Sequence, residues 1–158
     1  MNRDQTHIQR SLLDRLIDLS PEVSRDSASY RTADMGQIKG LVARDLEKLL
    51  NTKSPALPPP PAFREVARSL HIYGLSDFTS QNPKSAAVRQ RLRMEIEQAI
   101  RLFEPRLRNV SVRIEATPQN ERNLRFKITG LLVLDPVTEP VAFDTIFDVG
   151  RGEYAVSH

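Results

Sequence analysis

The spacing of apolar residues in this chain changes at Pro105, and that change constrains the fold more than any other feature. Downstream of it, apolar and polar residues alternate, which is the pattern of half-buried strands. Upstream, apolar side chains recur every three or four residues, as on one face of a helix, at Val88, Leu92, Ile96, Ala99 and Phe103. Because helices come first and strands follow, the sequence predicts an α+β fold.

Two helices are predicted before the proline-rich stretch. Ser11 heads a short apolar stripe that Pro21 ends. A clearer helix runs from Asp34 to Asn51, with Gln37 at the spacing of a capping box. Residues 22–33 between them are polar, so we expect residues 1–33 to form an N-terminal helical arm and residues 34–158 a single domain.

Residues 55–61 are proline-rich and are expected to form an extended spacer; a ligand for a proline-binding module is the alternative. The longest predicted helix opens with Asn82 as N-cap and Pro83 as its first residue. Between the proline-rich stretch and this longest helix, a short helix is predicted that ends at Gly74. It turns four apolar side chains inward, those of Phe63, Val66, Ala67 and Leu70.

Four strands are predicted after Pro105, joined by short polar turns, and short connections favour an antiparallel meander. Leu131 and Val133 make the second strand apolar on both faces. Such a strand is either covered twice by its own domain or extended by another chain. The strands span residues 110–116, 124–134, 141–147 and 153–156, with turns at 117–122, at 135–140, closed by Pro140, and at 150–152.

Composition narrows the function. The chain has 158 residues, no cysteine and no apolar stretch of the ~20 residues that span a bilayer, so a cytoplasmic protein without membrane insertion is expected. The three histidines are scattered, which argues against a metal site, and no sequence motif for a cofactor is present. A lysozyme-like hydrolase would need two carboxylates, with Glu104 and Asp77 as the pair to try. No catalytic site assembles around them, and an enzyme is not expected.

The basic residues concentrate in the segment 84–108, whereas acidic residues outnumber basic ones after it. An acidic protein surface is the first expectation for a partner, and nucleic acid is the alternative. Arg89, Arg93, Glu97 and Arg101 follow each other at four-residue steps, a ladder that a solvated helix face explains and that weakens the nucleic-acid alternative.

Glu104, Pro105 and Arg106 lie where the last helix meets the first strand. Pro105 cannot continue the helix, and the helix dipole disfavours an acid at this end. Glu104 therefore needs a cationic or N–H partner. Two alternatives remain open: a contact within the chain that joins helix to sheet, or an outward-facing pair of charges that partner chains neutralise.

Five segments in order resemble the TssE family, the small baseplate wedge subunits of the bacterial type VI secretion system. These subunits are in turn similar to a wedge component of contractile phage baseplates. They are residues 11–16 (SLLDRL), 44–53 (RDLEKLLNTK), 69–78 (SLHIYGLSDF), 103–107 (FEPRL) and 141–145 (VAFDT). The chain departs from the family pattern in its longer proline run and in His71, neither of which touches the Glu-Pro-Arg segment.

The resemblance implies a cytoplasmic structural subunit between the wedge proteins TssF and TssG and the contractile sheath of TssB and TssC, with TssK as a further candidate partner. It implies a fold similar to the interlocking (handshake) domain of sheath subunits, whose sheet accepts strands from neighbouring chains. The residues expected to bind partners are Glu104, Pro105, Arg106, Leu107 and Arg101. If both charges face outward, Glu104→Ala or Arg106→Ala should stop assembly and leave thermal stability nearly intact.

Overall fold

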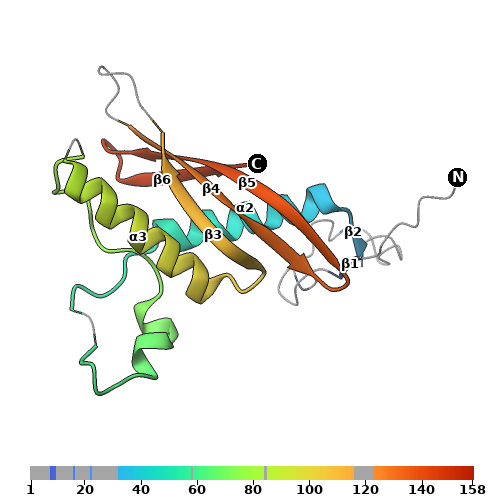
Figure 1. The fold of residues 1–158 in the computed structure, drawn as a ribbon, viewed down its shortest axis with the longest axis horizontal. Coiled ribbons are helices and arrows are strands. Elements are labelled where there is room, and N and C mark those ends of the chain that lie inside the picture. The colour runs from blue at the N-terminus through green and yellow to red at the C-terminus, as the bar shows by residue number, and fades with distance from the viewer. Residues whose placement is uncertain are drawn as a thin grey trace, which may run out of the picture.

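Two α-helices followed by a four-stranded antiparallel sheet form the main body, as Figure 1 shows. The computed structural model describes residues 8–9, 16, 22, 32–57, 59–83, 85–115 and 123–158. The helices are α2 (Met35–Asn51) and α3 (Ala86–Phe103). The strands are β3 (Leu107–Ile114), β4 (Leu124–Leu134), β5 (Val137–Asp148) and β6 (Glu153–Ser157), and a separate small sheet pairs β1 (Ile8–Gln9) with β2 (Thr32–Ala33).

The α+β class and the meander are confirmed. The strands lie in the order β3-β4-β5-β6, each antiparallel to the next. The turn predicted at 135–140 was too long, because β5 already begins at Val137. Pro140 lies inside this strand, opposite Leu131. β6 pairs only with Asp144–Asp148. Within the described part of the chain, Pro140 is therefore on an unpaired edge of the sheet, where a missing N–H costs no ladder hydrogen bond.

α2 begins where the sequence predicts, because the Asp34 carboxylate accepts a hydrogen bond of 2.7 Å from the Gln37 N–H. α3 does not. Its N-cap is Ser85, whose hydroxyl accepts from the Val88 N–H at 3.5 Å. Asn82 instead closes a turn by accepting from the Ser85 N–H at 3.1 Å, so Pro83 lies in that turn and not in the helix.

The core lies between the helices and one face of the sheet. α2 contacts β6 and α3 contacts β3, so the two helices cover opposite edges of the sheet (Figure 1). Each helix buries one apolar face, with Ile38, Val42, Leu46, Leu49 and Leu50 in α2 and Leu92, Ile96, Ala99 and Ile100 in α3. Val88 and Phe103, at the two ends of the row predicted for α3, are only partly buried. They meet the alternating inward residues of the strands, including Val112, Phe126, Ile128, Leu132, Phe143 and Phe147.

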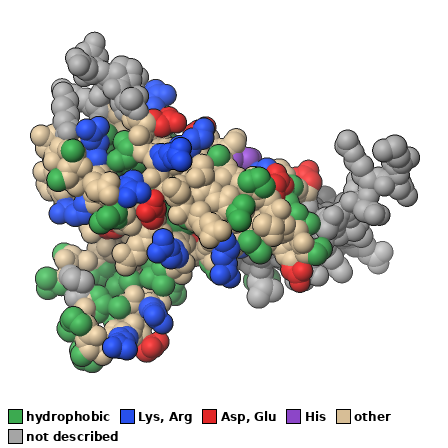
Figure 2. All heavy atoms as spheres, viewed as in Figure 1, with side chains coloured by type: hydrophobic (Ala, Val, Ile, Leu, Met, Phe, Trp, Pro, Cys, Tyr) green, Lys and Arg blue, Asp and Glu red, His purple; other side chains and the backbone are tan. Residues whose placement is uncertain are grey.

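The segment between α2 and α3 forms a projecting lobe, and the helix predicted there is wrong. The segment contains two short 3-10 helices, Val66–Arg68 and Leu70–Ile72. Ser69 separates them, because its hydroxyl donates to the Val66 carbonyl and accepts from the His71 N–H. Phe63 and Leu70, predicted to face inward, are 58% and 79% exposed. Figure 2 shows hydrophobic side chains over much of this lobe.

Several expectations fall on parts that the structure leaves undescribed. The first predicted helix, residues 11–21, lies outside the described residues except for Leu16, and so does the turn at 117–122. Val133 is 40% exposed, so at this end of β4 the second apolar face is open within the described part of the chain. No described helix is both long enough and apolar enough to cross a bilayer.

Candidate functional site

The corner between α3 and β3 is fixed by backbone hydrogen bonds on both sides of Pro105. The Glu104 N–H donates to the Ile100 carbonyl at 2.8 Å and closes the helix. The Leu107 N–H donates to the Glu104 carbonyl at 3.1 Å, and the Val133 N–H donates to the Arg106 carbonyl at 2.8 Å. The Arg106 carbonyl is therefore already bonded to the sheet, while the Glu104 N–H is still bonded to the helix. Their side chains leave this corner in directions that the backbone sets.

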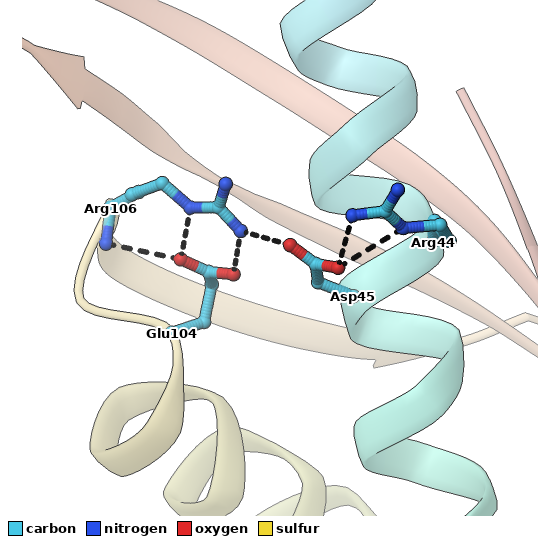
Figure 3. Close-up of polar contacts among 4 residues, drawn as sticks. All are labelled: Arg44, Asp45, Glu104 and Arg106. Carbon is cyan, nitrogen blue, oxygen red and sulfur yellow. Dashed lines mark hydrogen bonds and ion pairs between the residues drawn. The ribbon is translucent and has the colours of Figure 1, made fainter. Parts of the chain in front are cut away.

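Four charged side chains form one continuous network at this corner (Figure 3). The Arg106 guanidinium donates from Nε to Glu104 Oε1 at 2.6 Å and from Nη2 to Glu104 Oε2 at 2.5 Å. The same Nη2 donates to Asp45 Oδ2 at 2.7 Å. Arg44 completes the network by donating from Nε and Nη2 to Asp45 Oδ1. Two arginines and two acids leave the network neutral, which suits its partial burial.

Glu104 lies inside the molecule, with only 5% of the residue exposed. Its carboxylate oxygens are held by Arg106, which also donates its backbone N–H at 3.3 Å. Hydrogen bonding to Glu104 raises the pKa of Arg106, opposed by desolvation of the cation and supported by Asp45. The guanidinium thus stays charged at any pH at which the protein is folded.

The expectation that both charges face outward is wrong for Glu104. Of the two alternatives, the structure shows the contact within the chain that joins helix to sheet. It also adds Asp45, which was not predicted to lie at this corner. Arg44 and Asp45 are the first residues of segment 44–53, one of the five segments that resemble the TssE family. The resemblance therefore included both residues, but the spacing of the segments did not show that segment 44–53 contacts segment 103–107. The expected near-intact stability of Glu104 or Arg106 variants does not follow from this geometry.

Arg106 borders a groove of about 390 Å³ on the α2 side of the corner. Its apolar lining comes from Leu49, Tyr73, Phe103 and Pro105, and Asp45 and Lys48 also line it. Tyr73 meets Phe103 edge to face with ring centroids 5.0 Å apart. Burial raises the pKa of Tyr73, helped by the negative charges of Asp45 and Glu104. The arrangement is a largely apolar groove with a charged rim.

The five predicted site residues divide between two hollows. Glu104 and Arg106 line the groove described above, whereas Arg101 and Leu107 line a second hollow of about 440 Å³ on the other side of the corner. Pro105 is exposed and lines both. The charge ladder on α3 is less solvated than predicted, because Arg93 pairs with Glu97 at 2.9 Å and Glu97 also accepts from the Val112 N–H.

Side chains of α2 also cap the outer edge of the sheet at β6. The Asn51 amide donates to the Tyr154 carbonyl at 2.8 Å and accepts from the Tyr154 N–H at 2.7 Å. Glu47 accepts from the Val156 N–H at 2.9 Å. Both residues come from the segment 44–53, so this segment connects α2 to β6 as well as to the corner. This role was not predicted from the sequence.

The residues suggested for hydrolysis are not brought together. Asp77 is bonded to Lys53 at 2.6 Å, and that hydrogen bond lowers the pKa of Asp77, helped by bonds from Thr79. Glu104 lies in a different hollow and is held by Arg106. Among the residues that the structure describes, no three His, Asp or Glu side chains converge as ligands for a metal ion.

Comparison with known proteins gives one family. No curated protein matches the chain. A family model described as baseplate wedge protein gp25 matches residues 36–137, which run from the first turn of α2 to the start of β5 and include the whole charged corner. This chain thus belongs to the gp25 family of baseplate wedge proteins, which have a structural role in the baseplates of contractile tails.

Proposed function

We propose that this protein is the TssE-type subunit of a type VI secretion baseplate. In this proposal it lies in the cytoplasm, binds the wedge proteins TssF and TssG, with TssK as a further neighbour, and connects them to the first sheath ring. The family membership and the five ordered segments support the assignment. The observation that carries it is the network at the corner, which fixes one arginine at the rim of an apolar groove.

The wedge contact is proposed to use Arg106 and the groove beside it. Nε and Nη2 of Arg106 are occupied by Glu104 and Asp45, whereas Nη1 makes no hydrogen bond to any described residue (Figure 3). Two N–H groups therefore remain for a carboxylate or carbonyl of the partner. Such a hydrogen bond to a charged group contributes about 1.5–3 kcal/mol. An apolar side chain of the partner would occupy the groove.

Preorganisation explains why the network is built this way. A free arginine loses side-chain entropy of up to about 2 kcal/mol when it is immobilised. Arg106 is already held at two nitrogens, so most of that cost is met when the subunit folds and not when it binds. Buried Glu104 supplies orientation for the guanidinium and does not itself need to touch a partner.

The sheath contact is proposed to use strand addition by TssB or TssC, and the structure limits where this can happen. Asn51 and Glu47 occupy outward backbone groups of β6, and Glu97 occupies the Val112 N–H of β3. Covering an edge in this way is a known protection against unwanted strand pairing. A sheath strand must therefore displace these side chains or bind beside them.

The test is co-purification with TssF and TssG. Arg106→Lys keeps the positive charge but removes the fork and Nη1, and Lys48→Glu reverses a charge at the exposed rim without touching the network. Both should lose the wedge proteins. Arg44→Lys, which changes the network on the side away from the groove, is the matched control and should retain them. Thermal unfolding of each variant verifies folding. Undiminished co-purification of both test variants would contradict the proposal.

A further inference from the structure

The second hollow, on the far side of Pro105, has a chemistry of its own. Arg101 and Arg108 line it together with Leu107, Asn109 and Val110. Both guanidiniums belong to exposed residues, and neither forms an ion pair with any residue that the structure describes. No acidic side chain lines the hollow. It is therefore a concave positive surface without a neutralising group of its own in the described chain.

The local backbone explains how the two arginines meet. Arg101 lies in the last turn of α3, where a cation also offsets the negative end of the helix dipole. Arg108 lies beyond the corner on β3, directly before a bulge: it pairs with Leu131, the next pair is Ser111 with Thr129, and Asn109 has φ of +52°. Bulges bend a strand and change the direction of side chains. The helix dipole accounts for Arg101 only, so Arg108 remains to be explained.

We propose that this hollow binds an acidic segment of a partner protein, with one carboxylate on each arginine. Arginine matches carboxylates through two parallel hydrogen bonds, and Pro105, Leu107 and Val110 provide apolar walls for the stems of glutamate side chains. Single-stranded nucleic acid fits less well, because no aromatic side chain lines the hollow to stack on a base. The inference rests on the proposed function, because the partner is taken to be another protein of the same baseplate. It adds a second contact to the one proposed at the Arg106 groove.

Three other basic side chains of the Arg-rich segment support this choice. Arg91 lies over the Phe78 ring at 5.3 Å and donates to Gln81, Arg93 pairs with Glu97, and Arg106 belongs to the network. These three are engaged within the chain, so they do not extend the hollow into a basic stripe of the kind that follows a nucleic-acid backbone. The positive charge that remains at the corner is concentrated in the hollow.

The experiment measures binding of a short fluorescein-labelled peptide of alternating Glu and Ser to the full chain by anisotropy. A Lys/Ser peptide of the same length is the control ligand. Arg101→Gln and Arg108→Gln should each weaken binding of the acidic peptide by about tenfold, because each removes a charge-assisted pair. Arg113→Gln is the control variant, since Arg113 is exposed on the same strand but does not line the hollow. It should change the affinity by less than about twofold.

Three results would overturn the inference: no binding of the acidic peptide at low salt, equal loss in Arg113→Gln, or tighter binding of duplex DNA than of the peptide. Its failure can be separated from failure of the proposed function. If the acidic peptide does not bind but Arg106→Lys still loses TssF and TssG, only the proposed contact at the second hollow is contradicted, and the proposed function stands. If the peptide result holds and Arg106→Lys retains the wedge proteins, the wedge assignment fails and the hollow stands as an acidic-segment site.

Discussion

Arg106 and Asp45 are 61 positions apart in the sequence, and a hydrogen bond of 2.7 Å joins the guanidinium of one to the carboxylate of the other. This bond ties the middle of α2 to the corner between α3 and β3. Together with the Glu104 pair it makes the three elements one unit. The corner is therefore joined through α2 to β6, which Asn51 and Glu47 connect to the same helix.

Replacing Arg106 by methionine should destabilise the folded protein by about 3 kcal/mol at neutral pH, because the buried Glu104 carboxylate loses its cation. Urea denaturation at constant pH measures this loss. The double variant Glu104→Gln/Arg106→Met should recover at least half of it, since a neutral amide needs no counter-charge.

The matched control for that pair of variants is Arg101→Met, at an exposed arginine, which should change stability by less than about 0.5 kcal/mol. A free energy of unfolding for Arg106→Met equal to that of this control would mean that Glu104 is not held by Arg106 in solution.

Replacing Asn51 by alanine should open the outer edge of β6. The Tyr154 N–H and carbonyl lose their partners, and we expect faster hydrogen exchange at the amide of Tyr154. Exchange measured by NMR in native buffer tests this. Amides of β4, in the middle of the sheet, serve as the internal reference. Unchanged protection at Tyr154 would show that the cap is not formed.

The strands could be predicted because a period of two residues is a local property. Val112, Phe126, Ile128 and Phe143 are each spaced for burial on one face, and the short turns leave little choice of pairing. The corner could be located for the same reason, since Pro105 must end the helix. The contact within the chain between Glu104 and an arginine was one of two alternatives, but the second partner of Arg106, Asp45, could not be predicted, because spacing within one element does not show which residue of another element it meets.

The helix predicted in the projecting lobe was wrong for a related reason. Phe63, Val66 and Leu70 have the spacing of a buried helical face, but burial depends on whether the chain returns to the core. Ser69 instead satisfies neighbouring backbone groups and divides the segment into two short turns. The N-cap at Ser85 was missed because Asn82 followed by Pro83 carries the stronger local signal for the start of a helix.

Replacing Gly74 by alanine should destabilise the protein by more than about 2 kcal/mol. Gly74 has φ of +109°, and an added Cβ would lie 2.2 Å from the Thr52 carbonyl oxygen, which accepts from the Leu75 N–H. Gly36→Ala is the control, because there the nearest atom to the new Cβ is 3.4 Å away. Thermal unfolding compares the two, and equal melting temperatures would contradict the close approach.

Replacing Tyr154 by phenylalanine should reduce the loss of stability at high pH. Burial raises the pKa of Tyr154, with help from the charge of Glu95. Above about pH 10 the tyrosine of the unfolded chain ionises while the folded one keeps its proton, so the unfolded state binds fewer protons and stability falls as pH rises. Urea denaturation from neutral pH to pH 11 should show a shallower decline in the variant. Identical slopes would mean that the Tyr154 hydroxyl reaches solvent.

Replacing Thr145 by valine should leave the fold intact and stabilise it by about 1 kcal/mol. Thr145 is 1% exposed, lies in β5 between buried Phe143 and Phe147, and its hydroxyl has no hydrogen-bond partner within the described structure. Valine has nearly the same shape, so the exchange removes an unsatisfied polar atom from the core without creating a cavity. Urea denaturation measures the change, with Thr138→Val at an exposed position of the same strand as the control. A loss of stability in Thr145→Val alone would show that the hydroxyl is satisfied in solution, by a buried water that bridges it to the backbone.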